Sequence, residues 1–154
     1  MSQPSLPREG GCRCDRVRFR VTAPAIFTSA CHCRGCQKMT ASAFSLSMAI
    51  PADGFAVIAG ETVLGGLHGR LQHHFCSWCM SWMFTTAEEM PFFNVRTALL
   101  DDPSGFEPFL ETWTAEKLAW AATPAVHSFP TVPSMDDYAR LLTEYIAWQE
   151  RRQR

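Results

Sequence analysis

The sequence lacks an excess of charge of either sign. Among its 154 residues, 14 are basic and 15 are acidic, which gives a formal net charge of −1. A protein that binds nucleic acid or a membrane surface mainly through electrostatics needs a basic excess. We therefore expect neither nucleic acid nor a membrane among its partners.

Long hydrophobic segments are also missing. No apolar run approaches the roughly 18–20 residues that a membrane span requires. The segment Met1–Gly11 is polar and has no hydrophobic core of the kind found in a secretory signal. We therefore expect a cytoplasmic protein, whose thiols stay reduced.

Repeats and low-complexity tracts are absent as well, and the composition is that of a globular chain, with 47% apolar and 19% charged residues. The length suits one domain. We expect a flexible arm over residues 1–9, a β domain with an irregular extension over residues 10–133, and a helix over residues 134–152.

Short segments with alternating or β-favouring residues predict a mainly β fold. A glycine-rich stretch at Gly65–Gly69 is typical of a hairpin connection. From Asp101 to Pro133 the sequence contains five prolines, and we expect extended segments and loops there. The predicted strands are Arg16–Val21, Ile26–Ala30, Ala43–Ile50, Phe55–Ala59, Arg70–Phe75, Trp82–Thr85 and Phe92–Leu99.

The C-terminal segment has a helical pattern. Ser134 can cap a helix, and Asp137 three residues later resembles the acidic partner of a capping box. Apolar residues then follow at helical spacing. We expect an amphipathic helix packed on the domain, with the docking of a partner as the alternative. The apolar residues are Tyr138, Leu141, Leu142, Tyr145 and Ile146.

The seven cysteines are the most informative residues. An odd number cannot be paired completely into disulfides, and reduced thiols are instead available for metal binding or catalysis. Their spacing forms three clusters, two of which can each point a pair of sulfurs at one ion. The clusters are Cys12 with Cys14, then Cys31 with Cys33 and Cys36, then Cys76 with Cys79.

Zinc prefers four ligands in a tetrahedron, so the ligand count divides these cysteines into four and three. Four thiolates, from Cys12, Cys14, Cys76 and Cys79, would form a closed structural zinc site. The remaining three would bind a second zinc and leave its fourth position open, as in catalytic zinc sites. These three are Cys31, Cys33 and Cys36.

Other arrangements stay open on residue spacing alone. The three-cysteine cluster can share a metal with another cluster or form part of a two-metal cluster. A histidine can complete its coordination, and the candidates are His32, His68, His73 and His74. The three thiols can also act in redox chemistry without a metal.

These motifs resemble the family of the glutathione-dependent formaldehyde-activating enzyme, which includes the centromere protein V domain. The resemblance covers roughly residues 10–100 and rests on three cysteine motifs in the same order. These motifs are Gly11-Cys12-Arg13-Cys14, Cys31-His32-Cys33-Arg34-Gly35-Cys36-Gln37-Lys38 followed by Ala43-Phe44-Ser45, and Phe75-Cys76-Ser77-Trp78-Cys79.

The resemblance implies a β-tent fold of packed antiparallel sheets. It also implies a structural zinc at the four-cysteine positions and a catalytic zinc at Cys31, Cys33 and Cys36, with carbon–sulfur lyase activity. The family's name-giving reaction adds the glutathione thiol to formaldehyde. One departure is Met80, where the family usually has the glycine that a left-handed turn favours.

We therefore expect a thiol such as glutathione to bind the open zinc position as a thiolate and to react with a small electrophile. Arg34 and Lys38 flank the cluster and can bind a carboxylate of the thiol. The knuckle at Cys76 and Cys79 is apolar, and its apolar residues are expected either to belong to the core or to form a wall beside the open site. These residues are Trp78, Met80, Trp82, Met83 and Phe84. The alternative functions are a non-catalytic binding module and a thiol or metal sensor.

Overall fold

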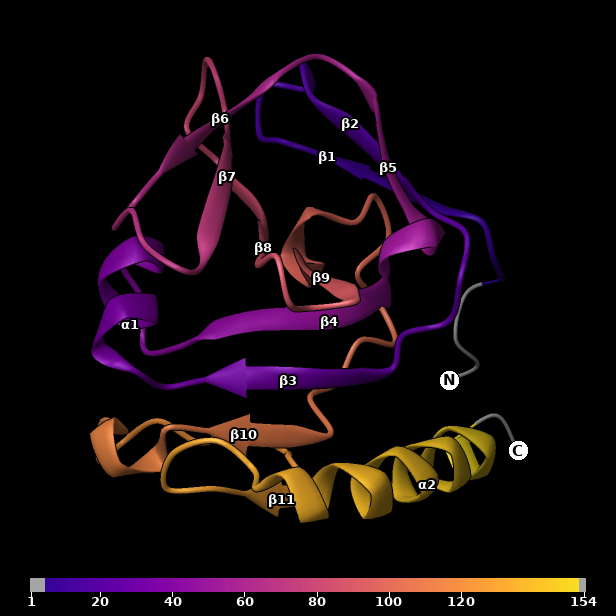
Figure 1. Cartoon of the computed structure of the whole chain (residues 1–154), viewed down its shortest axis with the longest axis vertical. Helices are drawn as coiled ribbons and strands as arrows, with labels where there is room; N and C mark the ends of the chain where they lie inside the picture. Colours follow the sequence, from indigo (N-terminus) through magenta and orange to yellow (C-terminus); the bar gives the residue numbers. More distant parts are fainter. Residues whose placement is uncertain (1–4, 153–154) are drawn as a thin grey trace. The chain divides into compact units, whose positions relative to one another are not determined.

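The computed structural model describes residues 5–152, which form eleven β-strands and two α-helices (Figure 1). The predicted mainly β class and the predicted C-terminal helix are confirmed. The chain divides into two compact units, each built from separate stretches of sequence. Unit 1 contains Ile26–Ser47 and the segment from Gly105 onward, and unit 2 contains Ser5–Ala25 and Met48–Ser104.

Unit 1 is built on three short parallel strands. Strand β10 (Leu110–Thr112) pairs on one side with β3 (Phe27–Cys31) and on the other with β11 (His127–Ser128). Helix α1 (Arg34–Thr40) follows β3 closely, and a 3-10 turn, Thr114–Glu116, follows β10. The register aligns Cys31 with Thr112, so the end of β3 lies next to the end of β10.

Helix α2 (Met135–Arg152) packs on this part of unit 1 and lies beside β10 and β11 (Figure 1). Its buried Leu141 and Tyr145 form a cluster with Phe109 and Leu110. The predicted capping box is present, because the amide of Asp137 donates to the Ser134 hydroxyl and the amide of Ser134 donates to the Asp137 carboxylate, each at 3.2 Å.

Unit 2 contains two sets of antiparallel strands. Strand β2 (Arg18–Val21) lies between β1 (Arg8–Gly11) and β5 (Phe55–Ala59). The second set runs in the order β6-β7-β8-β9, and β4 (Ser45–Pro51) crosses from unit 1 into unit 2. The strands of the second set are β6 (Thr62–Gly65), β7 (Gln72–Cys76), β8 (Trp82–Thr86) and β9 (Phe92–Arg96).

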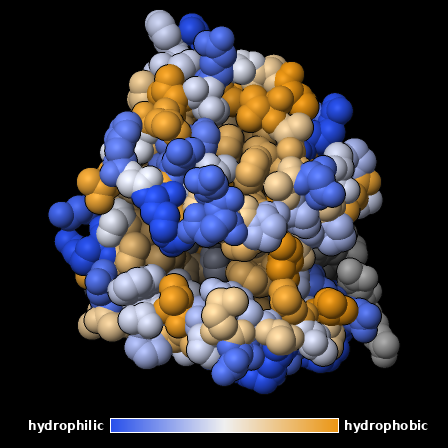
Figure 2. Space-filling view, in the orientation of Figure 1, coloured by the Kyte–Doolittle hydropathy of each residue, from blue (hydrophilic) through white to orange (hydrophobic). Residues whose placement is uncertain are grey.

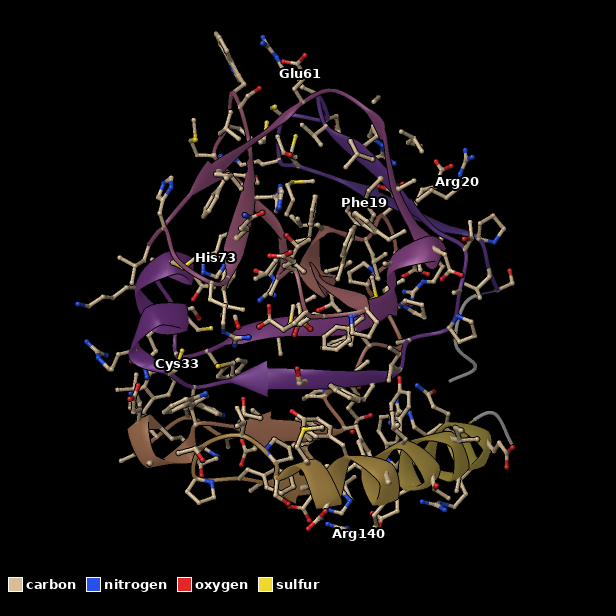
Figure 3. The ribbon with its side chains drawn as sticks, viewed as in Figure 1. Phe19, Arg20, Cys33, Glu61, His73 and Arg140 are labelled. Atoms are coloured by element: carbon tan, nitrogen blue, oxygen red, sulfur yellow. The ribbon has the colours of Figure 1, made fainter. Side chains whose placement is uncertain are left out.

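Aromatic side chains fill the core of unit 2. The ring of Phe55 packs against those of Phe19 and Phe84, with ring centroids 5.5 Å and 4.9 Å away. Phe19, which is labelled in Figure 3, is completely buried. Two 3-10 turns, Ala52–Gly54 and Thr97–Leu99, complete the unit. This core holds the β-strands from which the cysteine-bearing turns of unit 2 project.

The surface is mixed in polarity. On the face shown in Figure 2, hydrophilic and hydrophobic residues are interspersed. Some large apolar side chains remain exposed, such as Leu67 and Trp120. Within residues 5–152, neither helix has the length and apolar character needed to cross a membrane.

Several details differ from the sequence-based expectations. Arg8 and Glu9, assigned to the N-terminal arm, form the first half of β1, and residues 1–4 of that arm lie outside the described residues. Helix α1 was not predicted, because its seven residues include Gly35 and Thr40 and show no helical apolar pattern. Helix α2 belongs to the same compact unit as Ile26–Ser47.

Candidate metal centres

The three sulfurs of Cys31, Cys33 and Cys36 lie within 4.8 Å of one another in unit 1. Cys31 ends β3, Cys33 caps helix α1, and Cys36 lies in the first turn of that helix (Figure 3). The amide nitrogen of Cys36 donates to the Cys33 sulfur at 3.3 Å. All three residues are partly exposed, so a metal at this site would remain accessible to a small molecule.

Backbone hydrogen bonds fix the turn that carries these sulfurs. The amide of His32 donates to the carbonyl of Thr112 at 3.0 Å, which continues the β3–β10 pairing past the end of both strands. The Gln37 side-chain amide donates to the carbonyls of His32 and Glu116, at 2.6 Å and 3.0 Å. The cysteine turn is therefore held on both sides by β10 and by the segment that follows it.

The thiols influence one another strongly. Hydrogen bonds from the thiols of Cys31 and Cys36 to the Cys33 sulfur lower the pKa of Cys33 to about 2. Hydrogen bonds with the side chains of Cys31 and Cys33, together with burial, raise the pKa of Cys36. The group therefore favours one thiolate that accepts hydrogen bonds from its neighbours, and a metal ion can take the place of those protons.

Among residues 5–152, no histidine joins the three-cysteine group. His32 is fully buried, and its Nε2 donates to the Glu111 carboxylate at 2.9 Å. His73 and His74 hydrogen-bond to threonine hydroxyls of β8, and His68 lies in the connection between β6 and β7. The interpretation in which a histidine completes this site therefore finds no support.

A shallow groove of about 470 Å³ runs along helix α1. Its lining combines the cationic Arg34 and Lys38 with the apolar Leu118 and Trp120. The Arg34 guanidinium also donates to the Gln37 side chain. The groove thus offers positive charge and an apolar surface on the helix that carries Cys36.

A second group, of four cysteines, lies in unit 2. The sulfurs of Cys12, Cys14, Cys76 and Cys79 are all within 4.8 Å of one another. Cys12 and Cys76 are buried, and Cys14 and Cys79 are partly exposed. Four converging sulfurs match the ligand set of a closed tetrahedral zinc site.

Hydrogen bonds stabilise the thiolate forms of Cys12 and Cys79 in the four-cysteine group. The amides of Trp78 and Cys79 each donate to the Cys76 sulfur at 3.4 Å, and Val17 donates to the Cys12 sulfur at 3.3 Å. Desolvation raises the pKa of Cys79, but hydrogen bonds from the side chain and backbone of Ser81 oppose it, and the pKa falls to about 5. Deprotonated sulfurs are the form that binds metal.

In unit 2, each pair of cysteines is followed by a residue whose backbone adopts the left-handed conformation. Asp15 after Cys14 has φ 60°, and Met80 after Cys79 has φ 56°. The turn that glycine would favour is therefore made here by methionine. Of the apolar residues predicted around this knuckle, Met83 is buried and Trp78 is exposed. The centroid of the Trp78 ring lies 3.9 Å from the Arg16 guanidinium.

The sequence profile of the family described as "Glutathione-dependent formaldehyde-activating enzyme" matches residues 7–116, which include all seven cysteines. The chain belongs to this family. The predicted resemblance is thereby confirmed. The matched range includes both cysteine groups, so both lie in the part of the chain that is similar to the family.

A similar curated protein comes from Halomonas elongata and is named "Putative glutathione-dependent formaldehyde-activating enzyme". It is 33% identical over 86 residues, which are 49% of this chain and 55% of that protein, so the match spans little more than half of the relative. A Rhodobacter sphaeroides protein of known crystal structure has a TM-score of 0.51 at 20% identity, over 65% of this chain and 91% of that chain. The second similarity concerns the fold alone.

The sequence predicted both cysteine groups of this family member but missed a buried carboxylate behind one of them. Glu111 is 6% exposed and accepts the hydrogen bond of His32. The available signal was an isolated acidic residue in the largely apolar stretch Phe109–Trp113. Charged residues are rarely buried without partners, so such a position indicates a buried polar network.

Proposed function

We propose that this family member binds a thiol at a zinc ion held by Cys31, Cys33 and Cys36, and that it forms or breaks a carbon–sulfur bond. The observation that carries the proposal is the convergence of three partly exposed sulfurs without a fourth ligand among the described residues. Thiolates suit zinc, and three protein ligands with one open position are the pattern of a catalytic site.

Zinc bound at this site would keep an incoming thiol deprotonated and would stabilise a sulfur that leaves a carbon atom. In the synthetic direction, the thiol sulfur forms a bond to the carbon of an aldehyde such as formaldehyde. The electron pair of the carbonyl double bond moves to oxygen, which takes up a proton. The reverse reaction releases the thiol and the aldehyde, as a carbon–sulfur lyase does.

The chain's own residues would select and orient the thiol. The groove along α1 places Arg34 and Lys38 beside the helix that carries Cys36. Two cations there suit a thiol that carries carboxylates, such as glutathione, and Leu118 and Trp120 suit its apolar parts. We propose these side chains as the binding surface for the thiol.

The four-cysteine group is proposed as a structural zinc site. Its four sulfurs would complete the tetrahedral coordination of a zinc ion, and the group joins residues near the start of unit 2 to the turn between β7 and β8. A structural zinc can contribute on the order of 10 kcal/mol to folding. Its role is to stabilise unit 2 rather than to react.

The test is a cobalt-substituted protein titrated with glutathione. We expect the absorption bands of cobalt at the three-cysteine site to shift when glutathione is added, and the shift to be absent in Cys33→Ser. Loss of free formaldehyde in the presence of glutathione and the zinc protein would then identify the reaction. Unchanged cobalt bands would contradict thiol binding and favour a non-catalytic binding module.

A further inference from the structure

Glu111 is a buried carboxylate surrounded by hydrogen-bond donors. One oxygen accepts from His32 Nε2 at 2.9 Å and from the Thr123 hydroxyl at 2.8 Å, and the other accepts from the Ser128 hydroxyl at 2.8 Å. Lys117 Nζ lies 3.0 Å from both oxygens. With this many donors from different segments, the position of the carboxylate is tightly fixed.

The carboxylate of Glu111 orients the side chain of His32, which lies in the sequence between the proposed ligands Cys31 and Cys33. The His32 side chain is fully buried, and its Nδ1 has no hydrogen-bond partner. Its ring contacts the edge of Phe44 with centroids 5.2 Å apart. The bond from Nε2 to Glu111 is therefore the polar contact that orients the ring.

Orientation of this ring bears on the shape of the cysteine turn. The His32 backbone is already held by Thr112 on one side and Gln37 on the other. With the side chain anchored as well, the peptide units on both sides of His32 have little freedom. Those units set the directions in which the Cys31 and Cys33 sulfurs point.

A buried charged group is not explained by stability alone, because well-packed apolar residues often stabilise a fold as well as a buried ion pair does. Buried hydrogen-bond networks are well suited to holding the residues of a site in a fixed geometry. Here the network lies directly behind the turn that carries three converging sulfurs.

We propose that Glu111 is a positioning residue for the three-cysteine metal site and acts through His32. The inference rests on the proposed function, because it presupposes that Cys31, Cys33 and Cys36 bind a metal ion. Glu111 itself touches neither the sulfurs nor a substrate. Its effect is on how tightly, and in what geometry, the metal is held.

The test is the zinc and cobalt affinity of Glu111→Gln, measured by competition with a chelator. Glutamine keeps the size of the side chain but places an amide among donors such as Lys117. We expect zinc affinity at the three-cysteine site to fall by about tenfold, with altered cobalt bands. The affinity of the four-cysteine site should not change.

Glu144→Gln is the matched control. Glu144 also accepts a hydrogen bond from a histidine in unit 1, His127 Nε2 at 2.7 Å, but this pair involves helix α2 and not the cysteine turn. Its metal affinities should equal those of the wild type. In a Cys33→Ser background, Glu111→Gln should have no further effect on the metal that remains.

A Glu111→Gln protein with lower thermal stability but wild-type zinc affinity and cobalt bands would overturn the inference and leave the proposed function intact. A wild-type protein that binds metal only at the four-cysteine site would overturn both. If Glu111→Gln does not fold, Thr123→Val removes one donor from the oxygen that His32 contacts. That variant should weaken zinc binding at the same site by a few-fold, and unchanged affinity would refute the role of Glu111.

Discussion

The amide nitrogen of Met80 donates a hydrogen bond of 3.2 Å to the carbonyl oxygen of Cys76, and this contact closes the turn that carries Cys79. Met80 adopts φ 56° in this turn. The left-handed region costs a residue with a Cβ atom about 1–2 kcal/mol, whereas glycine enters it freely. The knuckle of unit 2 is thus formed at a cost in backbone strain.

We predict that Met80→Gly stabilises the metal-loaded protein by about 0.5–1 kcal/mol. Relief of the left-handed conformation outweighs the greater chain entropy of glycine in the unfolded state. The side chain contributes little to burial, because Met80 is 57% exposed. Denaturant unfolding in zinc-containing buffer measures the free energy difference.

Met80→Ala is the control for this prediction. Alanine removes the same exposed side chain but keeps the Cβ atom that makes the left-handed region unfavourable. It should give no gain in stability. Equal stabilisation by alanine and glycine would mean that the methionine side chain, and not the backbone conformation, is the source of the strain.

The two metal sites should respond differently to the loss of one ligand. Cys14→Ser removes a ligand from the four-cysteine group and should unfold unit 2, because structural zinc supplies a large part of such a domain's stability. Cys33→Ser should stay folded and lose one zinc, since serine can still cap helix α1. Metal analysis with circular dichroism checks both, and loss of both metals from Cys33→Ser would refute the division into four and three.

Stability should depend on the ionisation of Glu111. Burial raises the pKa of Glu111, but hydrogen bonds from Ser128, Lys117, Thr123 and His32 lower it overall to about 2. A lowered pKa in the folded state stabilises the protein above the unfolded value near 4.5 and loses this effect as the pH falls towards 2. The contribution at neutral pH is about 3 kcal/mol.

The measurement compares Cys33→Ser with Cys33→Ser/Glu111→Gln, so that neither protein carries the second metal. The difference in unfolding free energy should be largest above about pH 5 and should shrink between about pH 5 and pH 2. Acid releases metal from the four-cysteine site of unit 2 in both proteins, so the transition to compare is the unfolding of unit 1, which contains Glu111. A difference that stays constant over this range would show that Glu111 is not ionised in the folded protein.

The cysteine groups could be predicted from sequence because their ligands are close together in short motifs and their number is limited by zinc coordination. Strand Phe55–Ala59 was also predicted with its exact bounds, because its flanking turn residues are distinctive. The contact of His32 with Glu111 could not be predicted. These residues are 79 positions apart, and they meet through the parallel pairing of β3 with β10, a three-residue strand without a clear pattern.

Substitutions in helix α2 can distinguish its packing on the rest of unit 1 from its use in docking a partner protein. Leu141 is fully buried beside Phe109 and Tyr145, whereas Ile146 on the same helix is 61% exposed. Leu141→Ala should cost about 2–5 kcal/mol of stability, and Ile146→Ala should change it by no more than about 0.5 kcal/mol. Thermal and denaturant unfolding of the two variants gives this comparison. Similar small losses from both substitutions would mean that the helix does not pack on unit 1 in solution, and its apolar face would then be free to bind another protein.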